Sequence, residues 1–319
     1  TLYTVPPDMR VALPSRDGGL TVAALCDAYM ARFTGRDVTR GARLGFWRAQ
    51  LGDVTLAQVD DDLVHRGAVM LAEQPGRYYA GLDVDGKPIY KSRGKPRSAA
   101  TINRYLAALA ALFTWAIRNR ITPKGFTHPV RDVERGKEPP GRTRYLSDAE
   151  RTRLLQACKA SKWPRLYLFV VMAITTGARR GELLALRWRD VDLARKVAYV
   201  EQSKNTDKRT LPLVAAALEQ LQQFAGKPDE LVFPSRRDPD APMGVDDRWR
   251  QAVKAAKLSG VRLHDMRHTT ASYLAQSGAS SLEIGAVLGH RSLVAVKRYA
   301  HLNAGHSAAL VERVLGGIG

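Results

Sequence analysis

The chain has 319 residues, enough for two domains, and a formal net charge of +19 at pH 7. Residues 1–140 hold 21 basic and 14 acidic side chains, and residues 141–319 hold 29 and 17, so both halves are basic. This distribution favours a polyanionic partner, with nucleic acid first. An anionic membrane is disfavoured, because no apolar run reaches the ~18 residues of a spanning helix and no basic amphipathic helix dominates.

The ends of the chain and its two cysteines give few constraints. Cys26 and Cys158 lie in apolar helical patterns without metal-ligand spacing, so we expect reduced core residues of a cytoplasmic protein. The chain begins on Thr1 with no signal-peptide pattern, which leaves room for an upstream segment. Residues 1–19 are interpreted as an N-terminal extension.

Residues 20–122 are predicted to form a helical domain. Helical spacing of apolar residues begins at Leu20, and a second helix starts at Ser98, a good N-cap. The expected buried face of that helix holds Ile102, Leu106, Leu109, Phe113, Ala116 and Ile117. Three arginines fall outside this face and are candidate DNA contacts: Arg104, Arg118 and Arg120.

Between these helices, residues 74–98 look like an insertion that forms a β-hairpin. Asp85-Gly86 lies between Tyr78-Tyr79 and Ile89-Tyr90, which is the pattern of a hairpin turn. The segment is either an additional DNA or subunit contact or a tolerated surface hairpin. Because surface loops accept insertions readily, the second interpretation is slightly favoured.

The second half is predicted to be a separate domain, residues 145–319, behind a linker. Residues 123–144 are rich in proline, glycine and arginine and have no periodicity. Helices then dominate, with one hairpin formed by Lys196–Gln202 and Arg209–Leu213. The expected fold is mainly α with a small β-sheet, and α+β in the second domain. Two basic lobes on a linker can close around a duplex as a clamp.

The segment TTGARRGELLAL, Thr175–Leu186, places charge directly after an apolar helix. Gly177 is suited to end that helix. We therefore expect Arg179 and Arg180 near the interior with Glu182 close by, and a buried guanidinium needs a paired acid or an anionic ligand. A structural Arg179–Glu182 pair and an anion site remain equally open.

The segment LHDMRHTTASYLAQSG, Leu263–Gly278, reads as a helix with His264 and Arg267 on one face. His264 and His268 have the spacing of a zinc-protease motif, but its glutamate base is missing and an arginine intervenes. The arginine favours an anion over a metal ion. For His268, packing is the favoured interpretation.

The segment LGHRSLVAVKRYAHL contains the last candidates. A capping box of Ser280 and Glu283 starts a short helix that stops before His290, and Ser292 is a possible cap for the helix that carries Tyr299. Alone, Tyr299 would be a packed aromatic residue.

Together, these residues would suit phosphoryl transfer from DNA to the tyrosine. Two guanidiniums can bind the phosphate oxygens and stabilise the charge that grows on them. A histidine can handle the phenol proton, because its pKa lies near neutrality. A hairpin lysine can protonate the departing sugar oxygen. This chemistry requires no metal and no cofactor.

Four segments resemble the signatures of tyrosine recombinases, the phage integrase family: TTGARRGELLAL, the hairpin EQSK…LPL, LHDMRH and LGHRSLVAVKRYAHL. The resemblance is specific across Leu166–Leu302 and weaker over Leu20–Arg120. It implies that the catalytic residues are Arg179, Lys204, His264, Arg267, His290 and Tyr299. Glu182 would support Arg179, and Lys208 is an alternative to Lys204.

The resemblance also implies a reaction and an assembly. The tyrosine would form a 3′-phosphotyrosyl link and free a 5′-hydroxyl, and strands would then exchange through a four-way junction. A homotetramer would act on two double-stranded DNA sites in the bacterial nucleoid, without ATP or metal and with accessory DNA-bending or directionality proteins. A helix near the C-terminus would dock on a neighbouring subunit. Two other functions are weighed against this one: a DNA-binding regulator without catalysis, and a monomeric topoisomerase.

Overall fold

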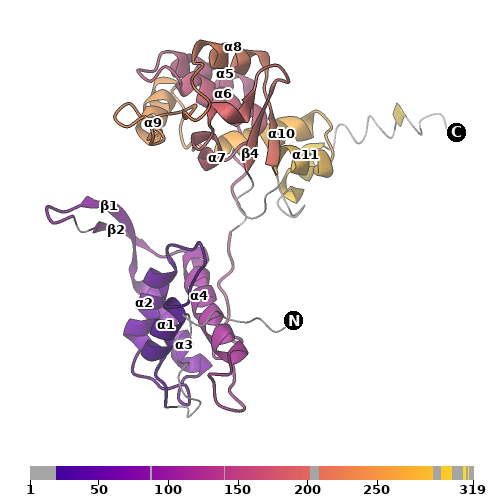
Figure 1. Ribbon diagram of the computed structural model, residues 1–319. Helices are drawn as coiled ribbons and strands as arrows, with labels where there is room; N and C mark the ends of the chain where they lie inside the picture. Colours follow the sequence, from indigo (N-terminus) through magenta and orange to yellow (C-terminus); the bar gives the residue numbers. More distant parts are fainter. Residues whose placement is uncertain are drawn as a thin grey trace, which may run out of the picture. The chain divides into compact units, whose positions relative to one another are not determined.

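The computed structural model describes residues 19–86, 88–139, 141–201, 208–289, 296–303, 312–313 and 315. The chain divides into two compact units, Thr1–Pro140 and Gly141–Gly319, coloured indigo to magenta and magenta to yellow in Figure 1. Each unit has its own buried core.

The described part of the first unit contains four helices and a β-hairpin. In chain order these elements are α1 (Val22–Met30), α2 (Arg40–Leu51), α3 (Asp61–Glu73), β1 (Pro75–Leu82), β2 (Pro88–Pro96) and α4 (Ala99–Arg118). The Ser98 hydroxyl accepts a hydrogen bond from the backbone N–H of Thr101, as predicted for the N-cap of α4. The indole N–H of Trp47 donates to the carbonyl of Tyr105 at 2.9 Å, which joins α2 to α4.

Helix α4 is the central helix of this unit. By length and composition it could cross a membrane, although the sequence analysis found no apolar run long enough for a spanning helix. Leu109, Leu112 and Phe113 are fully buried, so α4 is a core helix here. Ile117, predicted on the buried face, is 39% exposed because it lies in the last turn of the helix, beyond the packed core.

The predicted hairpin is present, and β1 pairs with β2 in antiparallel register, with Tyr79 opposite Tyr90. Gly86 adopts φ 76° next to the turn. The segment predicted as a linker differs from expectation, since Val130 and Val133 are buried in the first core and the boundary between the units falls at Pro140.

The second unit is mainly helical where the structure describes it, and these residues include an antiparallel sheet in the order β3-β4-β5. Its helices are α5 (Asp148–Lys159), α6 (Leu166–Thr176), α7 (Arg180–Leu184), η2 (Trp188–Asp190), α8 (Ala215–Gln223), α9 (Asp246–Ala255), α10 (Asp265–Gln276), α11 (Ser281–Leu288) and η4 (Lys297–Asn303). Its strands are β3 (Val191–Asp192), β4 (Val197–Glu201) and β5 (Lys208–Pro212). The mainly α fold with a small sheet is confirmed.

Helix α6 is buried on nearly all sides, as its apolar sequence predicts, and α10 packs against it. A smaller apolar cluster joins α10, α11 and η4, and it includes Tyr299. Both cysteines are free and buried, and burial raises the pKa of Cys26 to about 11 and that of Cys158 to about 12. The expectation that both thiols are core residues is confirmed.

Candidate active site

Two helices that precede predicted site residues in the sequence end at left-handed glycines. Helix α6 ends at Gly177 with φ 59°, and α11 ends at Gly289 with φ 65°. Glycine adopts this conformation without steric cost, so each helix stops sharply. Arg179 follows the first stop and His290 follows the second.

Arg179 is the N-cap residue of α7 and is paired with Glu182. Its Nη1 donates to Glu182 Oε1 at 2.6 Å, and its backbone N–H donates to Oε2 at 2.8 Å. The expectation of an interior position is wrong for both arginines, since the Arg179 and Arg180 side chains are 51% and 44% exposed. The turn at Gly177 explains this exposure, because it redirects the chain and leaves Ala178 as the last buried residue before α7.

Arg267, unlike Arg179 and Arg180, is buried. The residue is 5% exposed, and its Nη1 donates to the carbonyl of Gly177 at 2.7 Å. Its Nη2 is buried and has no hydrogen-bond partner among the described residues. Burial, followed by repulsion from Arg179 and Arg209, lowers the Arg267 pKa to about 10. A buried cation with an open donor is a site for an anion.

His264 lies beside Arg267, at the N-cap of α10 rather than within the helix. Burial, followed by the charge of Arg267, lowers the pKa of His264. A cavity of about 300 Å³ is lined by both residues, by Arg180 and by five apolar side chains: Phe169, Ala173, Ala178, Leu183 and Leu263. An anionic group that entered it would meet the positive side chains directly.

Tyr299 lies on η4 and is 2% exposed. Its hydroxyl is hydrogen-bonded to Nδ1 of His268, and the His264 and His268 rings meet edge to face with centroids 5.2 Å apart. Burial raises the pKa of Tyr299 and lowers that of His268. Packing was the favoured interpretation of His268; this buried residue also hydrogen-bonds to the predicted nucleophile.

Arg209 was missed by the sequence analysis. It is 6% exposed on β5, its guanidinium donates to the carbonyls of Leu288 and Thr176, and Nη1 lies 3.6 Å from Glu182 Oε2. Thr176 and Leu288 end α6 and α11, so one guanidinium binds the carbonyl ends of both helices. Alternation along β5 places Arg209 on the face of the buried Leu211, and this pattern could have identified it.

The remaining predicted residues are placed only in part. Lys204 and His290 lie outside the described residues, as does Ser292, and only the backbone of Lys208 is described. Arg104, Arg118 and Arg120 are exposed on or just after α4, which leaves them accessible to a ligand. Within the described part of the chain, no group of three or more histidine, cysteine or acidic side chains is placed to hold a metal ion.

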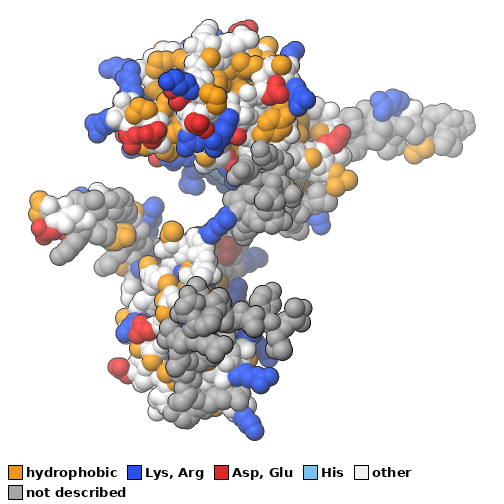
Figure 2. Space-filling model, in the orientation of Figure 1, with side chains coloured by type: hydrophobic (Ala, Val, Ile, Leu, Met, Phe, Trp, Pro, Cys, Tyr) orange, Lys and Arg blue, Asp and Glu red, His pale blue; other side chains and the backbone are white. Residues whose placement is uncertain are grey.

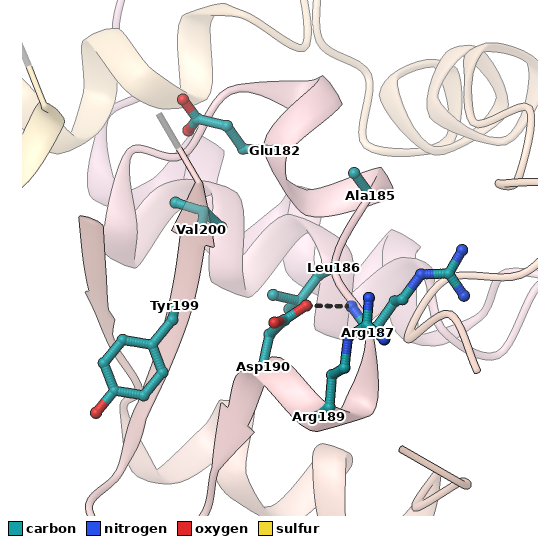
Figure 3. Close-up of a pocket in the computed structure, with 8 residues that line it drawn as sticks. All are labelled: Glu182, Ala185, Leu186, Arg187, Arg189, Asp190, Tyr199 and Val200. Carbon is teal, nitrogen blue, oxygen red and sulfur yellow. Dashed lines mark hydrogen bonds between the residues drawn. The ribbon is translucent and has the colours of Figure 1, made fainter. Parts of the chain in front are cut away.

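A larger cavity of about 510 Å³ lies on another side of Glu182, and Figure 3 shows its lining. The backbone N–H of Arg187 donates to Asp190 at 3.1 Å, as Figure 3 shows. Arg189 pairs with Asp229 at 2.5 Å. The ring of Tyr199 points away from these arginines in Figure 3. The site around Arg267 is therefore the better candidate, since it combines an open buried donor with Tyr299.

Residues 144–306, half of the chain, match the model of the phage integrase family. The shufflon-specific DNA recombinase of Escherichia coli is 34% identical over 223 residues, which cover 70% of this chain and 56% of that protein. The integrase of Salmonella phage P22 is 28% identical over 289 residues, which cover 83% of this chain and 71% of that protein. The chain thus spans only about half of the first relative.

Solved structures show the same fold over both units. The Tn1549 transposon integrase in complex with a circular intermediate DNA aligns with a TM-score of 0.69 at 19% identity, covering 92% of this chain and 100% of that one. A lambda integrase dimer bound to a COC′ core site aligns with a TM-score of 0.61 at 20% identity, covering 86% and 97%. With the family match over residues 144–306, the chain belongs to the phage integrase family of tyrosine recombinases.

Proposed function

We propose that this chain is a site-specific DNA recombinase that cleaves and rejoins strands through a covalent bond between Tyr299 and a 3′-phosphate. The observation that carries the proposal is the buried Nη2 of Arg267, which has no hydrogen-bond partner among the described residues. Arg267 lines a cavity together with Arg180 and His264, and it directly precedes His268, which is hydrogen-bonded to Tyr299. Leaving a buried donor unpaired costs about 1–3 kcal/mol. A bound phosphate would remove that cost.

The reaction exchanges one phosphodiester bond for another. Tyr299 Oη bonds to the scissile phosphorus, the bond from phosphorus to the 5′ oxygen breaks, and the phenol proton passes to a histidine. The departing oxygen takes a proton from Lys204 and becomes a 5′-hydroxyl. Attack by a second 5′-hydroxyl then reverses the step on another strand, so the bond count is conserved and ATP is not consumed.

The predicted catalytic side chains take distinct roles in this scheme. Arg179 and Arg267 bind the non-bridging oxygens of the phosphate, where charge grows in the transition state. Glu182 orients Arg179 through the 2.6 Å contact. By resemblance to tyrosine recombinases, His264 and His290 are the remaining catalytic residues. They are candidates for proton transfer and for phosphate binding.

In the state described, Tyr299 is too deeply buried to reach a phosphate. DNA binding must therefore break the His268–Tyr299 hydrogen bond and bring the phenol to the pocket of Arg267. Exposed Arg104, Arg118 and Arg120 are proposed DNA contacts of the first unit. The proposal includes a homotetramer on synapsed DNA sites, helped by accessory DNA-bending or directionality proteins, in the bacterial nucleoid.

The experiment is covalent capture on nicked duplexes that the protein itself has selected by binding from a random pool. Wild-type protein, in EDTA and without ATP, is expected to give a protein–DNA band on a denaturing gel. Tyr299→Phe should bind the same duplexes and give no band. Circular dichroism of the variant checks that its fold is retained.

Three outcomes would contradict the proposal. A band from Tyr299→Phe would remove Tyr299 as the nucleophile. No band on DNA that the wild type demonstrably binds would make the chain a binding regulator. Relaxation of supercoiled plasmid without site preference would point to a topoisomerase.

A further inference from the structure

The β1–β2 hairpin of the first unit has no core of its own. Figure 1 shows it projecting from the four helices, and every side chain described from Ile89 to Pro96 is exposed. An isolated two-stranded ribbon is marginally stable in water. A ribbon of this kind needs an anchor at its base, and its surface is free for a ligand.

Arg97 provides the anchor. Its Nη1 donates to the carbonyl of Leu71 at 3.1 Å and to Gln74 Oε1 at 3.0 Å. Its guanidinium also lies over the Tyr105 ring, 6.0 Å from the centroid. These contacts join the base of the hairpin to α3 and α4, so the ribbon leaves the helical body in a fixed direction.

Strand β2 carries three cations, Lys91, Arg93 and Lys95. A register shift, with Gly94 at φ 64°, interrupts the regular strand between Ser92 and Pro96. Lys91 pairs across the ribbon with Tyr78, and the Arg93 guanidinium lies 5.6 Å from the centroid of the Tyr78 ring. A shallow hollow of about 540 Å³ is lined by Tyr78, Ser92, Arg93, Lys95 and Pro96. Two cations, a hydroxyl and a ring face are suited to a sugar-phosphate backbone.

These cations differ from three exposed arginines of the second unit, which are ion-paired. Arg189, Arg195 and Arg250 lie 2.5 Å, 3.8 Å and 2.5 Å from Asp229, Asp192 and Asp247. Among the described residues, no carboxylate forms an ion pair with Lys91, Arg93 or Lys95. With Asp83 and Asp85 as the acidic residues of the hairpin, its cations remain in excess, which favours a polyanionic ligand.

We propose that the β1–β2 hairpin is a DNA-binding element, in which Lys91, Arg93 and Lys95 contact phosphates along one groove. A two-stranded ribbon has the right width for the major groove of B-DNA. The inference rests on the proposed function only in that DNA is the ligand. It replaces the interpretation of residues 74–98 as a surface hairpin of no function.

The test compares the salt dependence of DNA binding in three full-length proteins: wild type, Lys91→Gln/Arg93→Gln/Lys95→Gln, and the control Arg189→Gln/Arg195→Gln/Arg250→Gln. The control removes the same net charge from arginines that are already paired. Affinity for a fluorescent duplex from the selected pool is measured by anisotropy over a series of KCl concentrations. Thermal melts check that each protein is folded.

We expect the hairpin variant to reduce the slope of log K against log salt by about 2.7, since each phosphate contact contributes about 0.9. The control should keep nearly the wild-type slope. Equal slopes for the hairpin variant and the wild type would overturn the inference. An equal reduction of the slope in the hairpin variant and the control would also overturn it. Unchanged DNA binding with altered self-association would instead make the hairpin a subunit contact.

Covalent capture by the same proteins separates this inference from the proposed function. If the slope falls but no protein forms a covalent band, the hairpin binds DNA and the strand-transfer proposal fails. If the wild type forms the band and the slope is unchanged, only the hairpin inference fails.

Discussion

Burial determines the direction of the pKa shift at both His268 and Tyr299, which are joined by a hydrogen bond. Burial, followed by the nearby His264, lowers the pKa of His268, and burial raises that of Tyr299. Both groups are therefore neutral near pH 7, the phenol donates to Nδ1, and the ring proton of His268 is on Nε2. The attractive charge of Asp265 on His268 is outweighed by burial and by the cations Arg298 and Arg267.

The lowered pKa of the buried His268 predicts a loss of stability in acid. The unfolded chain protonates His268 at its ordinary pKa of about 6.5, while the folded protein resists protonation to a lower pH. The stabilisation by neutral His268 is thus complete above about pH 6.5 and is lost as the pH falls from there through the lower pKa of the folded protein. We expect the unfolding free energy of His268→Gln, measured by urea titration, to decline less than that of the wild type from about pH 7 to about pH 5.

His65→Gln is the matched control, because His65 is exposed on α3, and it should keep the wild-type pH dependence. Part of the pH dependence of the unfolding free energy should remain in His268→Gln, since burial also lowers the pKa of His264. A His268→Gln protein with the full wild-type dependence would show that this histidine does not control stability in acid.

At the scale of elements, the contact between the ends of α6 and α11 depends on one glycine. A Cβ on Gly177 would lie 2.3 Å from Leu288 Cδ2, and the residue has φ 59°. Gly177→Ala therefore adds overpacking, about 1–3 kcal/mol, to a left-handed conformational cost of about 1–2 kcal/mol. Gly260→Ala should show only the second cost, because φ is 61° there and the nearest atom is 3.8 Å away.

Urea denaturation of both variants measures the difference, and we expect Gly177→Ala to be the less stable by about 1–3 kcal/mol. The yield of covalent protein–DNA complex should also be lower for Gly177→Ala, since Gly177 directs the chain to Arg179 and accepts the hydrogen bond of Arg267. Equal stability losses in the two variants would mean that α11 moves away at little cost.

Local spacing predicted the elements well, because helical periodicity and turn residues act over a few positions. The two hairpins, α6 with its Gly177 stop and the capping box of α11 were all identified in this way. Contacts between elements were not predictable. His268 and Tyr299 are 31 residues apart and meet only because α10 packs on η4, and the exposure of Arg179 depends on where the chain turns after α6.

At the scale of the whole molecule, two basic units with separate cores suit a protein that contacts a polyanion at more than one place. Phe113 on α4 is fully buried in the first core, where its ring packs against Phe126 at 5.9 Å. Phe169 on α6 is fully buried in the second, with Phe233 at 5.2 Å. Because different residues form each core, damage to one core should remain in its own unit.

Phe113→Ala and Phe169→Ala test this independence, and each serves as the control for the other. Each removes a buried ring and should destabilise its own unit by about 3–5 kcal/mol. Hydrogen exchange followed by mass spectrometry should show lost protection in peptides of residues 19–139 for the first variant and of residues 141–289 for the second. Loss of protection in both units from either substitution would mean that the chain unfolds as one cooperative body, and that DNA binding by one unit also stabilises the other.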